Sequence, residues 1–414
     1  MNCPYAQLYH VALVASLAGA GCGDATVIDD DLVARFGLQP LPPMVFPADN
    51  PPDGARIALG RLLFFDPILS GDKDVACATC HLPEFAMADR RDLPAGPSGV
   101  GLGPNRVLTD PDMVPEGRNA ISVINVGFNR FVAQETADGF LFWDGRRRRL
   151  ENLVTLPLRE FTEMRHDAYA VEDALDSVLT RLRGTPEYDS LFRAAFPGKA
   201  DPVIDSVALS RVLAQFVRSL VSDDSPYDRF IAGDADALTA AQRRGLALFY
   251  SKGGCSGCHS SPMLSDFDFH VVGARQLGPG FQTTPHEDFG RWNATGLESD
   301  RWKFRTPSLR NVARTAPYMH SGGYATLREV VEFFNRGGGD LAAIPRERLD
   351  PRLRPLGLTT GEIDDLAAFL EALTDLPDVR APDRLPSGLE PPRLAVSGAR
   401  SSPSRAAAAR HGIQ

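Results

Sequence analysis

Two short cysteine motifs constrain this chain more than any other feature of its sequence. Both follow the spacing Cys-x-x-Cys-His, with Cys77, Cys80 and His81 in the first motif and Cys255, Cys258 and His259 in the second. This spacing is typical of c-type haem attachment, in which two thioethers hold the porphyrin and the histidine binds the iron. A structural zinc site usually keeps its cysteine pairs closer in sequence, and a thioredoxin-like redox pair needs no following histidine. The sequence therefore predicts two covalently attached haems.

The other two of the six cysteines, Cys3 and Cys22, lie near the start of the chain. Residues 11–20 form a run of apolar and small residues that is too short to span a bilayer but fits a signal peptide. Residues 17–22 loosely resemble a bacterial lipoprotein processing site, although no Lys or Arg precedes the apolar run. We expect residues 1–22 to be a signal peptide or lipoprotein leader. The protein is then periplasmic, and Cys22 is a candidate for a lipid anchor.

Length and charge limit the remaining classes. The chain of 414 residues is long enough for two domains, and its 44 basic and 53 acidic residues leave it mildly acidic. The only basic run, residues 146–149, is too short to indicate nucleic-acid binding. No nucleic-acid partner is expected.

An internal repeat predicts two related domains. The apolar segment 57–65 precedes the first cysteine motif, and the similar segment 243–250 precedes the second. Apolar residues recur at helical spacing in 207–221, and strand alternation is scarce, so the fold should be mainly α. The stretch 223–226 is the expected boundary between the domains.

The predicted organisation has four parts. Residues 1–22 are the leader, 23–225 the N-terminal domain, 226–378 the C-terminal domain and 379–414 a tail. Two capping boxes, at 326–329 and 359–362, should start helices of the C-terminal domain. The tail is rich in Pro, Arg, Ala and Ser, and we expect it to be disordered.

Further motifs, ordered along the chain, carry a family resemblance that runs from about residue 51 to residue 374. The chain resembles the bacterial di-haem cytochrome c peroxidases and the related MauG-type enzymes in both haem motifs and in the segments 117–120, 142–146, 161–164, 304–311 and 316–320. This resemblance implies two packed cytochrome c-like haem domains that face each other. It also implies that the haem on His81 is peroxidatic and that the haem on His259 accepts and relays electrons.

The resemblance also assigns roles to individual side chains. Glu163 matches the distal carboxylate that moves protons between the peroxide oxygens, and Pro157 matches a proline that walls the same pocket. Trp143 matches the tryptophan between the haems. The family's interdomain calcium site matches Asn119 and the backbone carbonyls of Thr315 and Pro317, which are hard oxygen ligands.

Three departures from the family pattern carry information. The segment between His81 and Asn119 holds no His, so the peroxidatic iron should be open without prior reduction, as in MauG-type members. Phe334 stands where the family has a Met or Tyr ligand to the second iron. Met319, His320 or Tyr324 could substitute, or that iron has five ligands. Leu153 replaces a pocket glutamine, and His166, which has no counterpart in the family, is expected at the surface.

The resemblance implies an enzyme that reduces hydrogen peroxide to water with electrons from a small cytochrome or copper protein. A MauG-like enzyme that oxidises a residue of a partner protein is the first alternative, and the first two departures favour it. A non-enzymatic di-haem electron carrier is the second alternative. The match at Glu163 and the absence of a distal His argue against the carrier.

Overall fold

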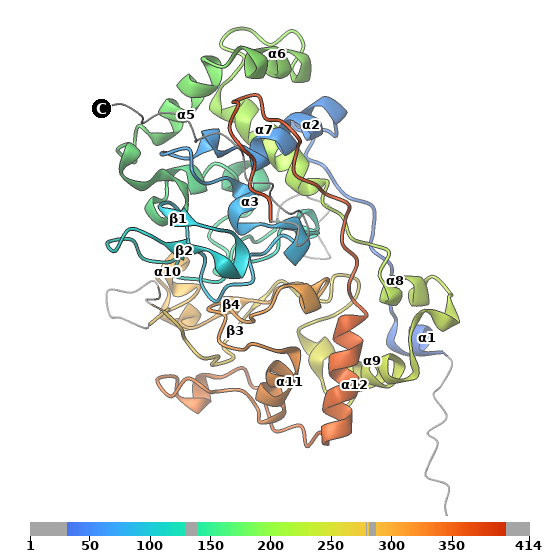
Figure 1. Cartoon of the computed structure of the whole chain (residues 1–414). Helices are drawn as coiled ribbons and strands as arrows, with labels where there is room; N and C mark the ends of the chain where they lie inside the picture. Colours follow the sequence, from blue (N-terminus) through green and yellow to red (C-terminus); the bar gives the residue numbers. More distant parts are fainter. Residues whose placement is uncertain (1–30, 130–138, 279, 281–286, 395–414) are drawn as a thin grey trace, which may run out of the picture.

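The computed structural model describes residues 31–129, 139–278, 280 and 287–394, and Figure 1 shows their arrangement in two halves. The expected leader with Cys22 and the last part of the expected tail, 395–414, lie outside the described residues. Both halves are mainly helical, as the sequence predicted. Among the described residues, strands are limited to two antiparallel pairs of two residues each, which are β1 (Gly99–Val100) with β2 (Val107–Leu108) and β3 (Phe269–His270) with β4 (Phe304–Arg305).

The first half contains the first cysteine motif. Its helices are α2 (Gly54–Phe65), α3 (Cys77–Cys80), α4 (Leu150–Leu153), α5 (Ala174–Arg183), α6 (Pro186–Ala195) and α7 (Ser206–Arg218). The helix expected from 207 to 221 is α7, which begins at the Asp205 cap and buries its apolar stripe. Leu209, Val212 and Leu213 on that stripe are at most 1% exposed. This burial against α2 is the centre of the first core.

The second half contains the second motif. Its helices are α8 (Pro226–Ile231), α9 (Ala240–Tyr250), α10 (Trp292–Thr295), α11 (Leu327–Asn335) and α12 (Thr360–Glu371). Thr326 and Thr359 cap α11 and α12 through reciprocal bonds with the glutamates three residues later, so both predicted capping boxes are confirmed. Thr239 caps α9 in the same way with Gln242. These local signals place the helix starts correctly.

The two halves repeat one arrangement of helices around the cysteine motifs. In the first half α2 precedes the motif and packs on α7, and in the second half α9 precedes the motif and packs on α12. The helix that precedes each motif has a glycine at the equivalent position, and this glycine permits the close helix crossing. A Cβ on Gly60 would lie 2.0 Å from the carbonyl oxygen of Val212, and a Cβ on Gly245 would lie 2.0 Å from that of Asp365. The internal repeat is therefore a repeated helix crossing.

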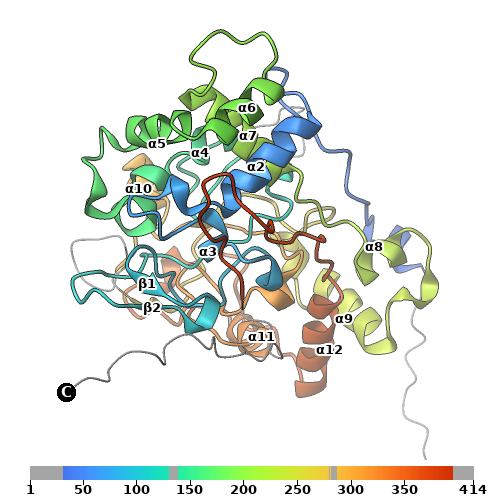
Figure 2. The ribbon, with the colours of Figure 1, turned by 45° about the horizontal axis from the view of Figure 1, so that its top comes forward.

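The chain ends depart from the predicted domain bounds, because each terminal segment packs on the opposite half. The N-terminal α1 (Leu32–Phe36) buries Leu32 in the core of the second half, although it was expected in the first domain. Residues 379–394 leave α12 and run back over the half that contains α2 and α7 (Figures 1 and 2). Leu385 is fully buried there, and the Ser387 hydroxyl donates to Asp66 at 2.7 Å. The prediction of disorder was wrong for this segment, because a few apolar anchors and hydrogen bonds hold it despite its Pro-rich composition.

None of the helices in the described part of the chain is both long enough and apolar enough to cross a membrane.

Candidate functional site

The histidines of the two cysteine motifs have the same local geometry. His81 follows α3, and its Nδ1 donates to the carbonyl oxygen of Met87 at 2.9 Å. His259 follows a short 3-10 turn, Cys255–Gly257, and its Nδ1 donates to the carbonyl oxygen of Leu264 at 2.8 Å. Burial lowers the pKa of both rings, so both are neutral near pH 7. A neutral imidazole that donates through Nδ1 presents Nε2 as a ligand for a metal.

The four cysteines of the motifs are free thiols in the structure. Burial raises the pKa of Cys77 and of Cys255 to about 12, so these thiols are protonated near pH 7. Two free thiols and a histidine with an available Nε2 fit a covalently attached haem at each motif.

One group of metal-binding side chains lies beside the second motif. Donor atoms of Cys258, Asp266 and His270 lie within 4.8 Å of one another. His270 bridges Asp266 and Asp350, with 2.9 Å from a ring nitrogen to each carboxylate. A haem thioether on Cys258 removes the thiolate from this group, and the two ion pairs account for the position of the ring.

A cavity beside the first motif collects most of the side chains that the sequence singled out. It holds roughly 1360 Å³ of space free of protein atoms, part of it open to solvent, and α3 with His81 forms one side. Pro157, Glu163, Trp143 and Leu153 line the same cavity. The structure therefore brings the candidate peroxidatic residues together around the motif of His81.

Glu163 lies in a single π-helical turn, Phe161–Arg165, where its half-buried side chain lines the cavity. Burial raises the pKa of Glu163 to about 8, and the nearby charge of Glu116 acts in the same direction. Arg146 opposes these two effects. A carboxyl group with a pKa near neutrality can both take and return a proton.

Glu116 also lines this cavity, and the sequence analysis missed it. The available signal was its position three residues before Asn119, within the stretch that carries the Arg-Asn motif. Because a single glutamate in a polar loop is usually solvated, this position alone does not reveal a buried carboxyl group.

Trp143 lies in the wall between the first cavity and a second one. Its side chain is buried, and its indole nitrogen donates to the carbonyl oxygen of Asn119 at 2.9 Å. Trp143, Arg305 and residues 119–122 line both cavities. The indole therefore lies where the two halves of the protein meet.

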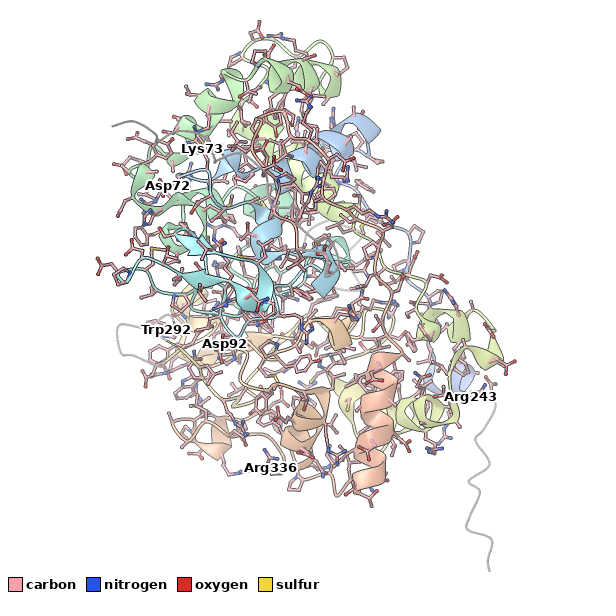
Figure 3. The ribbon with its side chains drawn as sticks, in the orientation of Figure 1. Asp72, Lys73, Asp92, Arg243, Trp292 and Arg336 are labelled. Carbon is pink, nitrogen blue, oxygen red and sulfur yellow. The ribbon has the colours of Figure 1, made fainter. Side chains whose placement is uncertain are left out.

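The second cavity is lined by the three candidate calcium residues and by Met319. Asn119, Thr315 and Pro317 come together there from the two halves of the chain. The Asn119 side-chain nitrogen donates to the carbonyl oxygens of Arg91 at 2.7 Å and Asp92 at 3.2 Å. Figure 3 labels Asp92 near the junction of the halves.

The candidate ligands for the second iron have different environments. His320 stacks on Phe304 with ring centres 3.8 Å apart, and its Nε2 is bonded to the Gln276 side chain at 2.7 Å. The Tyr324 hydroxyl donates to Asp340 at 2.9 Å. Met319 lines the second cavity, whose lining does not include His259. Phe334 packs in a small apolar cluster.

A buried arginine joins the two halves at the edge of the first cavity. Arg118 is bonded to Asp144 of the first half and Asp288 of the second, both at 2.7 Å. The side chains of all three are at most 5% exposed. His166, by contrast, is paired with Asp72 at 2.7 Å and lies outside the cavity. Asp72 is labelled toward the outside of the first half in Figure 3.

A mainly helical chain with one Cys-x-x-Cys-His turn in each half, and a carboxyl-lined cavity beside one of them, defines the class of c-type cytochromes with a reaction pocket. The family model for di-haem cytochrome c peroxidase matches residues 54–236. Cytochrome-c peroxidase IdrP1 of Pseudomonas sp. (strain SCT) is 34% identical over 386 residues, covering 87% of this chain and 91% of that protein. The chain belongs to the di-haem cytochrome c peroxidase family.

Other relatives of this chain are named either MauG or di-haem peroxidase. Methylamine utilization protein MauG of Methylorubrum extorquens is 34% identical over 378 residues, covering 90% of this chain and 94% of that protein. Among solved structures, a MauG-like protein associated with microbial copper homeostasis matches with a TM-score of 0.67 and 31% identity, over 81% of this chain and 93% of that one. The diheme peroxidase BthA of Burkholderia thailandensis shares the fold, with a TM-score of 0.62 and 23% identity over 83% of this chain and 91% of that one.

Proposed function

We propose that this protein is an exported di-haem enzyme that reduces hydrogen peroxide to water with electrons from a small cytochrome or copper protein. The observation that carries the proposal is the cavity that His81 and Glu163 share. Family membership supports an oxidoreductase with two haem c groups. The periplasmic location and a lipid anchor at Cys22 belong to the proposal.

The residues of the cysteine motifs hold the haems in this proposal. Cys77 and Cys80 form the thioethers of the first haem, with His81 on its iron, and the equivalent residues of the second motif hold the other. When bound, a haem supplies the electron chemistry that the side chains lack. The chain's own contribution is to fix each imidazole through Nδ1 so that its Nε2 faces one direction.

Glu163 supplies the proton transfer in this proposal. Cleavage of peroxide requires a group that accepts the proton of one oxygen and delivers it to the oxygen that leaves as water. The pKa of about 8 leaves Glu163 able to serve in both directions near pH 7. Pro157 and Leu153 form an apolar wall of the cavity and limit the water around the carboxyl group of Glu163.

Electron delivery and the calcium site complete the proposal. His259 would hold the haem that accepts electrons from the donor protein, and Trp143, whose indole lies in the wall of both cavities, would couple the two halves. A calcium ion bound by the Asn119 side-chain oxygen and the carbonyls of Thr315 and Pro317 holds the halves together. The gathering of these residues at one cavity supports that assignment.

A MauG-like reaction is the second candidate, in which the same haems oxidise a residue of a partner protein. The Phe334 substitution and the absence of His between His81 and Asn119 favour it. Rapid steady-state turnover of peroxide with a reduced small cytochrome distinguishes the two reactions. The peroxidase predicts rapid turnover, and the protein-oxidising enzyme predicts slow turnover.

The Glu163→Gln variant tests the proposed acid–base group. The amide keeps the shape of the carboxyl group but cannot carry the proton, so turnover should fall by about 100- to 10,000-fold. The haem content should stay unchanged, which separates this effect from loss of structure. Wild-type rates in the variant would contradict the assignment, and a carrier without enzymatic activity would show no turnover in either protein.

A further inference from the structure

The cavity beside His81 holds two carboxyl groups, and the proposed acid–base role uses only one. Glu163 comes from the π-helical turn 161–165, and Glu116 comes from a loop that is fixed by the bond from its N–H to the carbonyl oxygen of Pro94 at 2.9 Å. Both line the cavity together with His81. Two segments of the chain therefore direct acidic side chains into one space.

Glu116 carries an unusual buried oxygen. Its Oε1 is shielded from solvent and has no hydrogen-bond partner among the described residues. A buried carboxylate oxygen without a partner costs free energy, and that cost disappears when the group is protonated or shares a proton with a neighbour. The unpartnered Oε1 of Glu116 therefore favours a protonated carboxyl group or a proton shared with a neighbouring group.

The surrounding charges act on both carboxyl groups alike. Burial raises the pKa of Glu116, and Thr162 and Arg146 oppose this rise while the charge of Glu160 adds to it. Glu160 and Arg146 act on Glu163 in the same directions. Because the charge of Glu116 raises the pKa of Glu163 across the cavity that both groups line, their protons are coupled.

The other cationic groups of the cavity do not neutralise the pair. Arg118 is held by Asp144 and Asp288. The Arg305 Nε donates to the carbonyl oxygen of Phe142 at 2.9 Å. These bonds direct both guanidinium groups to other acceptors.

We infer that Glu116 and Glu163 form a pair that shares one proton, and that Glu116 resupplies Glu163 with protons during turnover. The inference rests on the proposed reduction of peroxide. That reaction breaks the O–O bond, takes two electrons from the donor protein and adds two protons from solvent to give two water molecules. Glu163 alone can move the proton already present from one oxygen to the other. Two further protons must enter the cavity in each turnover, and Glu116, which lines the same cavity, relays them to Glu163.

The variant Glu116→Gln tests the pair through a pH titration of the ferric holoenzyme. The infrared stretching band of a protonated carboxyl group reports the protonation of Glu163 directly, without turnover. Loss of the neighbouring charge should lower the midpoint of this band by about one pH unit or more. The limb of the pH–rate profile that reports Glu163 should move by the same amount, and kcat near pH 7 should fall about 10-fold or more.

Three further variants complete the test. Glu160→Gln removes an exposed charge near the pair but none from the cavity, so its midpoint should move much less. Glu116→Asp keeps the second carboxyl group and should restore most of the wild-type profile. The reciprocal variant Glu163→Gln should lower the midpoint of the remaining Glu116, and it decides the matter if Glu116→Gln fails to fold.

A wild-type midpoint and pH profile in Glu116→Gln would overturn the inference. A wild-type enzyme without peroxide turnover would contradict the proposed function instead, and the infrared midpoints would still show whether the two groups share a proton. An equal shift in Glu160→Gln and Glu116→Gln would also overturn the pair, because a general field effect would then explain both.

Discussion

The repeated helix crossing predicts that an alanine in place of either glycine at the crossing destabilises that half of the protein. In Gly245→Ala the new Cβ would lie 2.0 Å from the Asp365 carbonyl oxygen and 2.7 Å from the Phe369 Cβ. In Gly60→Ala the corresponding contact is with Val212, also at 2.0 Å. These oxygens belong to helix backbones, so the crossing helices must separate by more than 1 Å to restore ordinary contact.

The cost follows from overpacking of a buried helix contact. Such changes cost about 1–3 kcal/mol, and the higher helix propensity of alanine recovers up to about 1 kcal/mol of it. We expect a net loss of about 2 kcal/mol, which lowers Tm by about 4–8 °C for a domain of this size. Thermal unfolding of the holoenzyme followed by far-ultraviolet circular dichroism measures the shift.

Matched controls lie on the same helices. Gly54 in α2 and Gly361 in α12 are exposed, and a Cβ at either position meets no atom within 4 Å. Gly54→Ala and Gly361→Ala should therefore leave Tm unchanged or raise it slightly. If Gly245→Ala and Gly60→Ala are as stable as these controls, the close crossing does not determine the packing.

Three other predictions concern the junction of the halves and the second haem. In Trp143→Phe, peroxide added to the fully reduced enzyme should oxidise the first haem promptly and the second slowly in stopped-flow absorption, whereas unchanged oxidation of both would leave Trp143 a packing role. Met319→Ala should abolish a low-spin, high-potential signal in the electron paramagnetic resonance spectrum and redox titration if Met319 binds the second iron, and an unchanged signal would exclude it. Arg118→Met removes the ion pair of the buried Asp288 and one of the two ion pairs of the buried Asp144, and should cost about 3–5 kcal/mol in chemical denaturation. Arg229→Met, at an exposed pair, should leave the free energy of unfolding nearly unchanged; equal losses would contradict the importance of burial.

Local signals in the sequence predicted the helices well. Capping boxes at Thr326 and Thr359 and the apolar stripe of α7 act within a few residues, so they can be read without knowledge of the fold. The exchange of terminal segments could not be predicted in this way. Leu32 and Leu385 become core residues only because distant parts of the chain form their pockets.

The residues of the candidate site also differ in whether the sequence alone can reveal them. The motif of His81 was recognisable from its Cys-x-x-Cys-His spacing, and Trp143 and Glu163 from segments that resemble those of the family. Glu116 was missed because its place in the cavity depends on how segments far apart in the sequence enclose it. The hydrogen bond of Tyr324 to Asp340 likewise depends on a tertiary contact that spacing does not reveal.

The most direct test of the account is the number of haems bound covalently to the purified protein. Both motifs have free cysteines and a histidine held through Nδ1, so each should carry one haem c. A pyridine haemochrome assay with quantitative amino-acid analysis should give two haems c per chain, and acidic acetone should extract none. One haem per chain, or haem that is extracted by the solvent, would contradict the central claim.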